Sequence, residues 1–390
     1  MKKAVAENKN NIDRPYQVCN CCVMDTSDPD ITFDENGVCN RCNEFKERIL
    51  PNWNYGNGHE EELNKLIADI KRKGKNNKYD CILGLSGGLD STYMLHLAVK
   101  EWGLRPFVFH IDAGWNLPVA EENIKKVTEK LGVELHIEKM DWDEMREMQL
   151  AWFKTGLENL DAPQDHAFIA LIDKYSKKLG VKYILNGYNI STEIIADPAS
   201  WSDGYQTGDH KFMKDVVKKY CRIPIRNYTF TTGFRHKFVN PYLKHIKTIK
   251  PLNLVPITRQ QMIDTLGKEY GYEPYGQKHF EDLITKFLEG YWVPTKFGHD
   301  IRRAQLSSLV VTGQMTREEA LKILEKKPLS DKESKELFSE VAKRLEISEE
   351  ELQSFYDLPR CSVKFKNQNK LYNFGIRLFE VLGIEKRIRK

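Results

Sequence analysis

Apolar and polar residues alternate along the middle of the chain in a pattern that predicts an α/β fold. Short apolar segments bounded by turn residues predict strands at 79–85, 105–112, 133–140 and 181–188. Apolar residues recur at helical spacing at 92–102, 118–132 and 165–180. Strands that alternate with helices in this way predict a doubly wound parallel sheet.

The two ends of the chain follow other patterns. Ile31 and Phe33 precede a turn at 34–37, which predicts a small hairpin. After Pro256, amphipathic segments open with capping-box patterns, whose first residues are Thr258, Thr316, Ser330 and Ser348. We therefore predict three regions, at 1–58, 59–255 and 256–390.

The N-terminal region carries two C-x-x-C pairs. Cys19 and Cys22 form the first, and Cys39 and Cys42 follow after sixteen residues. Two such pairs complete a tetrahedron of thiolates around Zn²⁺ and leave no position for water, so we predict a structural zinc site. The neighbouring Cys21 is an alternative ligand to Cys22.

Composition narrows the class of protein. The chain has 390 residues, 41% of them hydrophobic and 30% charged, as in ordinary globular proteins. No apolar stretch suits a membrane span, and the N-terminus lacks the hydrophobic part of a signal peptide, so we expect a cytoplasmic protein with reduced cysteines. A net charge of +4 is too small to indicate a nucleic-acid-binding surface.

The segment "LSGGLDS" at 85–91 predicts a phosphate-binding turn between a strand and a helix. Ser86, Gly87 and Gly88 let backbone amides and a helix N-terminus approach an anion. Asp90 can hold Mg²⁺, and Ser91 can donate its hydroxyl to a phosphate oxygen. The lysine of a Walker A loop is absent.

Two further residues are expected beside this loop. Ligands of open α/β sheets collect at the carboxyl ends of strands, which places Ser86, Asp112 and Gly187 on one edge. Asp112 is a candidate for the nucleoside end of ATP, or it caps a turn.

Two later segments carry candidate chemistry. Residues 189–252 are rich in aromatic and basic side chains. Such a segment can cover an anionic substrate that contains a ring, or bind single-stranded RNA by stacking and phosphate contacts. It can also be a partly buried insertion whose aromatic residues are core. The segments 275–282 and 296–308 carry more polar side chains than a packing helix needs: Lys278, His279, Asp300, Arg302 and Arg303. These residues can supply cations to phosphates and a titratable group near the reacting atoms. Alternatively, they are charges on exposed helix faces.

The ordered motifs resemble one family. The S-G-G-x-D-S string resembles the PP-loop of ATP pyrophosphatases, which cleave ATP between its α and β phosphates. Together with "CVMD", "FDENGVCNRC", "HIDAGWN", "LNGYN", "YGQKHFED" and "FGHDIRRAQLSSLVVTGQMTREEAL", it resembles the N-acetyl sugar amidotransferases of O-antigen and flagellar-glycan biosynthesis. The resemblance covers most of 19–321.

The resemblance implies a fold and an activity. The fold is a doubly wound sheet of PP-loop ATP pyrophosphatase type, with an N-terminal zinc-knuckle module and a helical C-terminal region. The activity is conversion of the N-acetyl group of a nucleotide-linked or nonulosonate sugar to an acetamidino group. ATP adenylates the acetamido oxygen, ammonia attacks, and AMP and PPi are released.

The expected site follows from this reading. Asp90, Ser91, Lys278, His279 and Arg302 are the catalytic candidates, and Asp90 also holds magnesium. Residue 2 is not a cysteine and no G-x-C-x-G elbow is present, so the family implies a separate glutaminase subunit, with a cyclase-like barrel protein that channels ammonia.

Two other functions compete with this one. A tRNA-thiolating enzyme also joins a PP-loop to zinc knuckles, but it needs reactive cysteines near the loop and a basic RNA face. A non-catalytic ATP-binding scaffold would not need Asp90.

Overall fold

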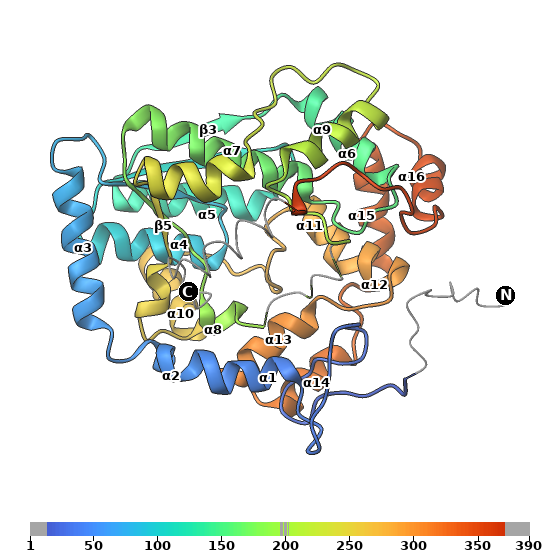
Figure 1. Ribbon diagram of the computed structural model, residues 1–390, viewed down its shortest axis with the longest axis horizontal. Helices are drawn as coiled ribbons and strands as arrows, with labels where there is room; N and C mark the ends of the chain where they lie inside the picture. Colours follow the sequence, from blue (N-terminus) through green and yellow to red (C-terminus); the bar gives the residue numbers. More distant parts are fainter. Residues whose placement is uncertain (1–13, 196–197, 199–200, 202, 371–390) are drawn as a thin grey trace.

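The computed structural model describes residues 14–195, 198, 201 and 203–370 (Figure 1). Its parallel sheet has the strand order β3-β2-β1-β4-β5. The strands are β1 (Cys81–Gly84), β2 (Pro106–Asp112), β3 (Leu135–Lys139), β4 (Tyr183–Leu185) and β5 (Lys247–Ile249). The predicted doubly wound parallel sheet is confirmed, and β5 adds an edge strand that the sequence did not indicate.

Strand order places the site. The chain runs outward from β1 through β2 to β3, then returns to lay β4 on the other side of β1. A crevice opens at the carboxyl ends of two strands whose connections leave in opposite directions. The switch point therefore lies at the ends of β1 and β4.

Helices cover both faces of the sheet. Leu83 and Val108 point to the face covered by α3 (Glu60–Gly74), α4 (Leu89–His96), α5 (Pro118–Leu131) and α10 (Arg259–Tyr270). Ile82 and Phe109 point to the other face, where they pack against α7 (Ala162–Leu179). Because side chains alternate along a strand, β1 and β2 supply both layers of the core.

A second core joins α6 to the helices of the C-terminal region. The largest apolar cluster includes Trp152, Phe287 and Trp292. Its elements are α6 (Trp142–Phe153), α9 (His210–Tyr220), α11 (Leu283–Phe287), the π-helical turn Leu288–Trp292, α12 (Val293–Lys296), α15 (Asp331–Arg344) and α16 (Glu349–Tyr356).

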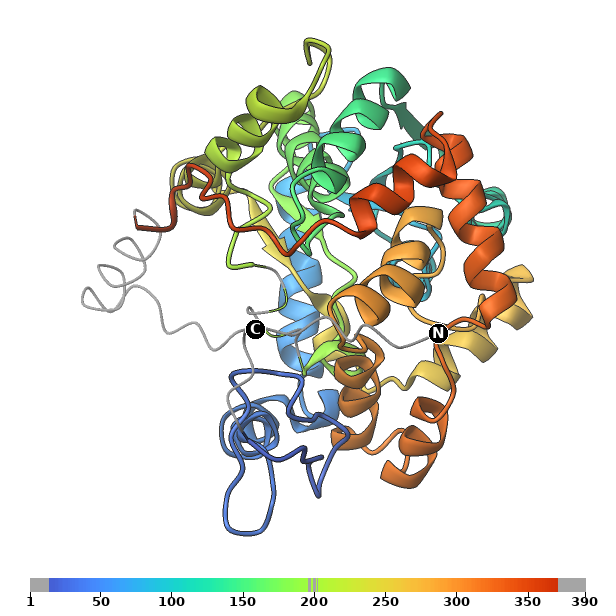
Figure 2. The same ribbon diagram turned by 90° about the vertical axis from the view of Figure 1, so that its right-hand side faces the viewer.

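The N-terminal module packs on the C-terminal half of the chain (Figure 2). It contains α1 (Asn40–Glu44) and α2 (Leu50–Trp53), and it lies beside α8 (Ile190–Glu193), α13 (Arg302–Val311) and α14 (Arg317–Leu324). Arg303 Nε lies 2.9 Å from Asp25 Oδ2. Arg317 Nε donates to the carbonyls of Cys19 and Cys22 at 2.9 and 3.1 Å.

Local signals at the helix starts and in the hairpin are confirmed. Complete capping boxes begin at Thr258, Thr316 and Ser330, and Ser348 accepts the amide of Glu351. Phe33 pairs with Cys39 in an antiparallel bridge around the predicted turn. Within the described residues, no helix is both long and apolar enough to cross a bilayer.

The aromatic segment at 189–252 proves to be mainly core. Trp201, Phe212 and Tyr228 are buried, and Trp201 stacks on His299 with ring centroids 4.2 Å apart. Of the interpretations open at the sequence level, the buried insertion is the one that these rings support.

Candidate active site

The predicted phosphate loop joins β1 to α4 at the switch point. Gly87 has a φ of +83°, and a Cβ there would lie 2.7 Å from the Ala120 carbonyl oxygen. Gly88 is the N-cap of α4 and supplies no side-chain hydrogen bond to the first turn. The amides at the start of α4 are therefore left without a side-chain cap, which suits an anion.

Two serines hold the loop in shape. Ser86 Oγ lies 3.1 Å from Ser91 Oγ and accepts the Gly88 amide at 3.1 Å. Ser91 Oγ donates to the Gly88 carbonyl at 3.2 Å. Both hydroxyls remain on the cavity wall, within reach of a bound phosphate.

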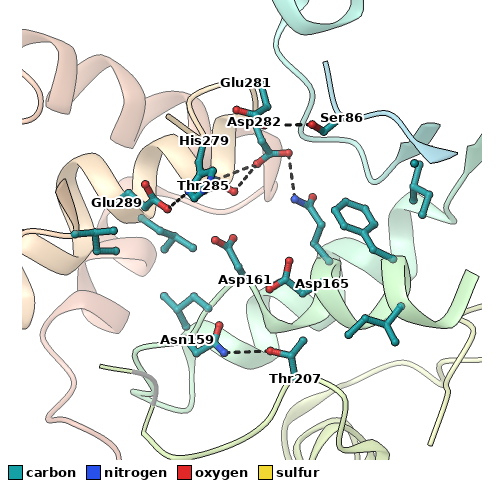
Figure 3. A pocket seen from close by; sticks show the side chains of 18 of the residues that line it. Ser86, Asn159, Asp161, Asp165, Thr207, His279, Glu281, Asp282, Thr285 and Glu289 are labelled. Carbon is teal, nitrogen blue, oxygen red and sulfur yellow. Dashed lines mark hydrogen bonds and ion pairs between the residues drawn. The ribbon is translucent and has the colours of Figure 1, made fainter. Parts of the chain in front are cut away.

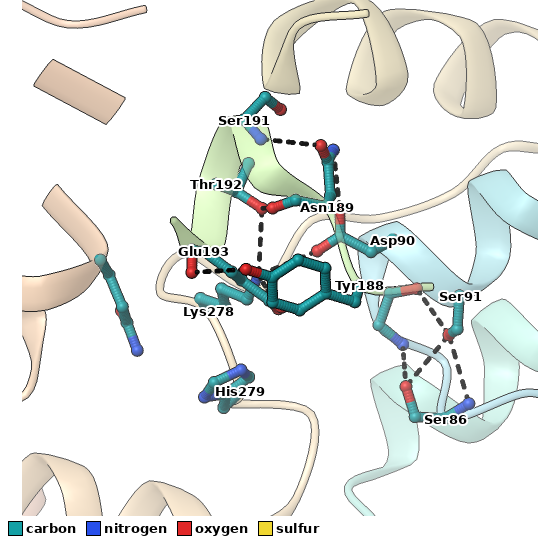
Figure 4. A network of polar contacts seen from close by, with 12 residues as sticks. Ser86, Asp90, Ser91, Tyr188, Asn189, Ser191, Thr192, Glu193, Lys278 and His279 are labelled. Carbon is teal, nitrogen blue, oxygen red and sulfur yellow. Dashed lines mark hydrogen bonds and ion pairs between the residues drawn. The ribbon is translucent and has the colours of Figure 1, made fainter. Parts of the chain in front are cut away.

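Lys278 brings the C-terminal region to this loop (Figure 4). Its Nζ lies 3.0 Å from Asp90 Oδ2, 2.5 Å from Glu193 Oε1 and 3.2 Å from Thr192 Oγ1. Burial lowers the pKa of Lys278, but the two carboxylates outweigh it and raise that pKa above its ordinary value. A cation is thus fixed beside the loop at neutral pH.

Glu193 is a site residue that sequence reasoning missed. It lies in α8, just after β4, and its carboxylate joins that of Asp90 through Lys278. The sequence could have indicated Glu193 by its position, because it follows the strand that ends near Gly187, on the edge of the sheet already expected to bind ligand.

His279 is the second predicted residue that reaches the site. Its Nδ1 lies 2.9 Å from Glu289 Oε1. Burial lowers the pKa of His279, but the Glu289 charge outweighs it and raises the pKa to about 9. Its φ of +67° is unusual for a residue with a side chain. The imidazole is a cation at neutral pH.

The other predicted residues of the C-terminal region make internal contacts. Arg302 Nη2 lies 2.6 Å from Asp300 Oδ2 and 2.7 Å from the Lys326 carbonyl, although the side chain also lines the cavity beside the loop. Arg303 binds the N-terminal module through Asp25.

Asp112 and Gly187 both lie on the predicted edge of the sheet. Asp112 Oδ1 accepts the Gly114 amide at 2.9 Å, so Asp112 caps a turn, which is the second of its two predicted roles. Its side chain lines neither of the two cavities at this edge of the sheet. A Cβ on Gly187 would lie 3.1 Å from the Ser91 amide nitrogen. Glycine lets the segment after β4 pass close to the loop.

Two cavities open on this edge. The first, the loop cavity, has a volume of about 820 Å³ and contains the loop, Lys250, Arg259 and Lys278. The second, the acidic cavity, has about 850 Å³ and six carboxylates on its wall (Figure 3). These acids are Glu158, Asp161, Asp165, Glu281, Asp282 and Glu289. The residues that line both cavities include Ser86, His279 and Glu281.

The charge of the acidic cavity is partly suppressed. Exclusion of water by the surrounding protein, together with neighbouring carboxylates, raises the pKa of Asp161 well above its ordinary value. The same exclusion of water raises the pKa of Asp165 to about 6 and that of Asp282 to about 7. Among the described wall residues the basic groups are three histidines, His110, His279 and His299. The cavity therefore favours cationic or neutral groups over anions.

The four predicted cysteines converge on one point. The Sγ atoms of Cys19, Cys22, Cys39 and Cys42 all lie within 4.8 Å of one another, and all four residues are buried. The Cys19 sulfur accepts amides of Cys21, Cys22 and Cys39 at 3.2–3.4 Å. Such bonds favour thiolate, so the cluster is suited to a metal. Cys21 is half-buried and lies outside this set.

The fold and the loop define a PP-loop protein of the ATP-using superfamily. Residues 80–190 match the phosphoadenosine phosphosulfate reductase domain. Residues 281–379 match the C-terminal domain of LPS biosynthesis protein WbpG-like proteins. The chain joins these two domains, which supports the resemblance that its motifs carry.

Individual relatives are distant. An uncharacterized protein of Methanocaldococcus jannaschii, MJ1599, is 24% identical over 287 residues, covering 73% of this chain and 84% of its own.

Three solved structures are also similar. An NMN synthetase from Francisella tularensis (TM-score 0.29, 13% identity) covers 57% of this chain and 98% of its own. An NH3-dependent NAD synthetase from Campylobacter jejuni (0.30, 14%) covers 68% and 97%. The U34-tRNA thiolase NcsA from Methanococcus maripaludis with its 4Fe–4S cluster (0.31, 14%) covers 79% and 84%.

Proposed function

We propose that the protein is an ATP-dependent amidotransferase that converts the N-acetyl group of a nucleotide-linked or nonulosonate sugar to an acetamidino group. The observation that carries this proposal is the joining of a PP-loop, at the switch point of the sheet, to a WbpG-like C-terminal domain. That domain contributes His279's partner, Glu289, and part of both cavity walls.

The loop cavity suits ATP. Amides of the loop and of the first turn of α4 bind the phosphates, and Lys250, Arg259 and Lys278 supply positive charge. An amide oxygen is a poor leaving group, and adenylation turns it into AMP. Fixed cations stabilise the pyrophosphate that departs.

Magnesium fits the oxygen donors of this cavity. Asp90 and Glu193 already converge on one cation, Lys278, and Mg²⁺ prefers one or two carboxylates together with substrate phosphates. Asp90 and Glu193 would hold the ion, which would neutralise charge on the phosphates.

The N-acetyl end of the acceptor, rather than its anionic nucleotide or carboxylate, suits the adjoining cavity. The N-acetyl group is neutral and its amidine product is a cation, so neither is repelled by the acidic wall. The shared residues Ser86, His279 and Glu281 mark where the two substrates would meet.

We propose that the cysteine cluster binds zinc in a structural role. Cys19 and Cys42 sulfurs are 3.9 Å apart, and Cys22 and Cys39 sulfurs 3.7 Å. A Zn–S distance of about 2.3 Å gives tetrahedral S···S separations of about 3.8 Å. The thiolates of an iron–sulfur cluster bind separate irons and lie farther apart.

Ammonia is proposed to come from a separate glutaminase subunit, with a cyclase-like barrel protein, in the cytoplasm. This partnership rests on the family resemblance.

The first experiment supplies ATP, Mg²⁺ and excess ammonium with a panel of nucleotide-linked N-acetyl sugars or with unmodified tRNA. Sugar-dependent AMP and PPi, with oxygen replaced by NH in the sugar by mass spectrometry, supports the amidotransferase. AMP formed with tRNA alone supports thiolation instead. None of the described residues on either cavity wall is a cysteine, which favours the sugar reaction.

A further inference from the structure

Glu281 stands on the wall that the loop cavity and the acidic cavity share (Figure 3). Two contacts fix its backbone. The Leu117 amide donates to the Glu281 carbonyl at 3.1 Å, and Asn116 and Asp282 form a β-bridge. The segment after β2 thus sets the position of this residue against the phosphate loop.

The two oxygens of the Glu281 carboxylate differ. Oε1 accepts the Ser86 hydroxyl at 3.4 Å and lies close to Gly88, where an added Cβ would approach it to 2.6 Å. Oε2 is buried and accepts no hydrogen bond from the described residues. A buried acceptor without a donor is costly, so this oxygen calls for a ligand that carries a proton.

The neighbouring candidates are already engaged. His279 is protonated at neutral pH because its pKa is raised to about 9, and Lys278 is held between Asp90 and Glu193. Asp282 caps α11 by accepting the Thr285 amide at 3.0 Å. Asp161 also has a buried oxygen that makes no hydrogen bond with the described residues, but Asp161 lines only the acidic cavity and not the loop cavity.

The reaction requires a proton acceptor at this place. Attack of ammonia on the carbon that bears the adenylated oxygen forms a C–N bond, moves the C=N electron pair onto the acetamido nitrogen and leaves a positive charge on the new nitrogen. Collapse needs the loss of that proton, and the C–O bond then breaks with its electron pair leaving on AMP.

We propose that Glu281 is the general base that accepts the proton of the attacking ammonia. This inference rests on the proposed amidotransferase function. Ammonia enters from the acidic cavity, the AMP-linked oxygen lies toward the loop cavity, and Glu281 stands between them. The protonated carboxyl returns its proton to the amidine nitrogen or to water as the cationic product leaves.

The test separates adenylation from amination in Glu281→Gln. With the sugar acceptor identified by the first experiment, we expect acceptor-dependent exchange of labelled PPi into ATP to stay near the wild-type rate. Amidine formation from ammonia should fall about 10²–10⁴-fold, the usual contribution of a general base. Glu281→Asp should recover part of this loss.

Hydroxylamine sharpens the test, because its adduct is acidic enough to lose the proton unaided. The Gln variant should lose much less activity with hydroxylamine than with ammonia. The matched control is Glu273→Gln, an exposed carboxylate of the same segment that pairs with Lys126 at 2.7 Å. Its rates should match the wild type.

Three results overturn the inference. Equal loss of PPi exchange and of Mn²⁺ affinity would make Glu281 a metal ligand. An unchanged amination rate would remove it from the step, and an amination loss confined to Asp161→Asn would move the base there. If wild-type protein shows no sugar-dependent exchange, the proposed function fails first.

Discussion

Lys278 Nζ lies 3.0 Å from Asp90 Oδ2, although the two residues are 188 positions apart. The contact ties the phosphate loop to the segment that precedes the WbpG-like domain. Since Lys278 also binds Glu193, three separate parts of the chain meet at one cation. The geometry leads to predictions for the loop, the metal and the joined modules.

Asp90→Asn should abolish AMP formation while the fold is kept. The change removes one proposed magnesium ligand, and Lys278 retains Glu193 as its partner. We expect a loss of about 10³-fold, since metal contacts supply several kcal/mol and each 1.36 kcal/mol is tenfold. Rates of AMP release and far-UV circular dichroism check this. Retained turnover would take Asp90 out of the mechanism and favour the scaffold hypothesis.

Gly87→Ala should abolish ATP binding, because its Cβ would lie 2.7 Å from the Ala120 carbonyl oxygen at a φ of +83°. Gly132→Ala is the matched control, with a φ of +64° but nothing within 4 Å. That control should lose about 1–2 kcal/mol of stability from the left-handed backbone and keep its ATP affinity. Calorimetric titration with a non-hydrolysable ATP analogue measures the affinity of both variants, and urea unfolding measures the stability of the control. Equal affinities would mean that the loop tolerates the shift.

Cys39→Ser should lose the bound metal and destabilise the N-terminal module. Cys21→Ser, which changes a sulfur outside the cluster, should keep both metal and melting temperature. Elemental analysis of purified protein gives the metal and its stoichiometry. Iron and acid-labile sulfide in place of zinc would contradict the zinc assignment, and metal retained by Cys39→Ser would contradict the ligand set.

Arg303→Ala should destabilise the fold by about 3 kcal/mol, because it leaves the buried Asp25 without its ionic partner at 2.9 Å. Arg48→Ala removes an exposed pair with Glu44 at 3.9 Å and should cost less than about 0.5 kcal/mol. Urea unfolding compares the two. Similar costs would show that Asp25 finds other compensation.

Glu289→Gln should lower the pKa of His279 from about 9 to below its ordinary value near 6.5, because burial and the Lys278 charge, which lower it, are then opposed only by the Glu281 charge. The raised pKa makes the pair stabilise the folded state fully below about pH 6.5 and lose that contribution as pH rises through about 9. The variant should therefore be more destabilised near pH 6 than near pH 10. Imidazole NMR titration and unfolding at both pH values check this, and a pH-independent difference would exclude the ionic origin.

Much of the architecture could be predicted because its signals are local. Gly87 and Gly88 between a strand and a helix, and two cysteine pairs at fixed spacing, each depend on neighbours in sequence. Capping boxes at Thr258 and Thr316 belong to the same class. The division of the chain at 58 and 255, and the site roles, stay predictions.

The partners of the C-terminal cations could not be read in this way. Lys278, Arg302 and Arg303 look alike in sequence, yet the first binds Asp90, the second Asp300 and the third Asp25. Glu193 belongs to no motif, and Glu281 lies inside the segment "YGQKHFED" with nothing local to single it out from its neighbours.

The sequence by itself determined the class of fold, the phosphate loop and the cysteine set, because turn geometry, helix capping and ligand spacing act over a few residues. Only the tertiary structure decided that Lys278 joins Asp90 to Glu193, that the aromatic segment is core, and that an acidic cavity adjoins the loop. Those features depend on which distant side chains packing brings together, and charge and burial then set what each group can do.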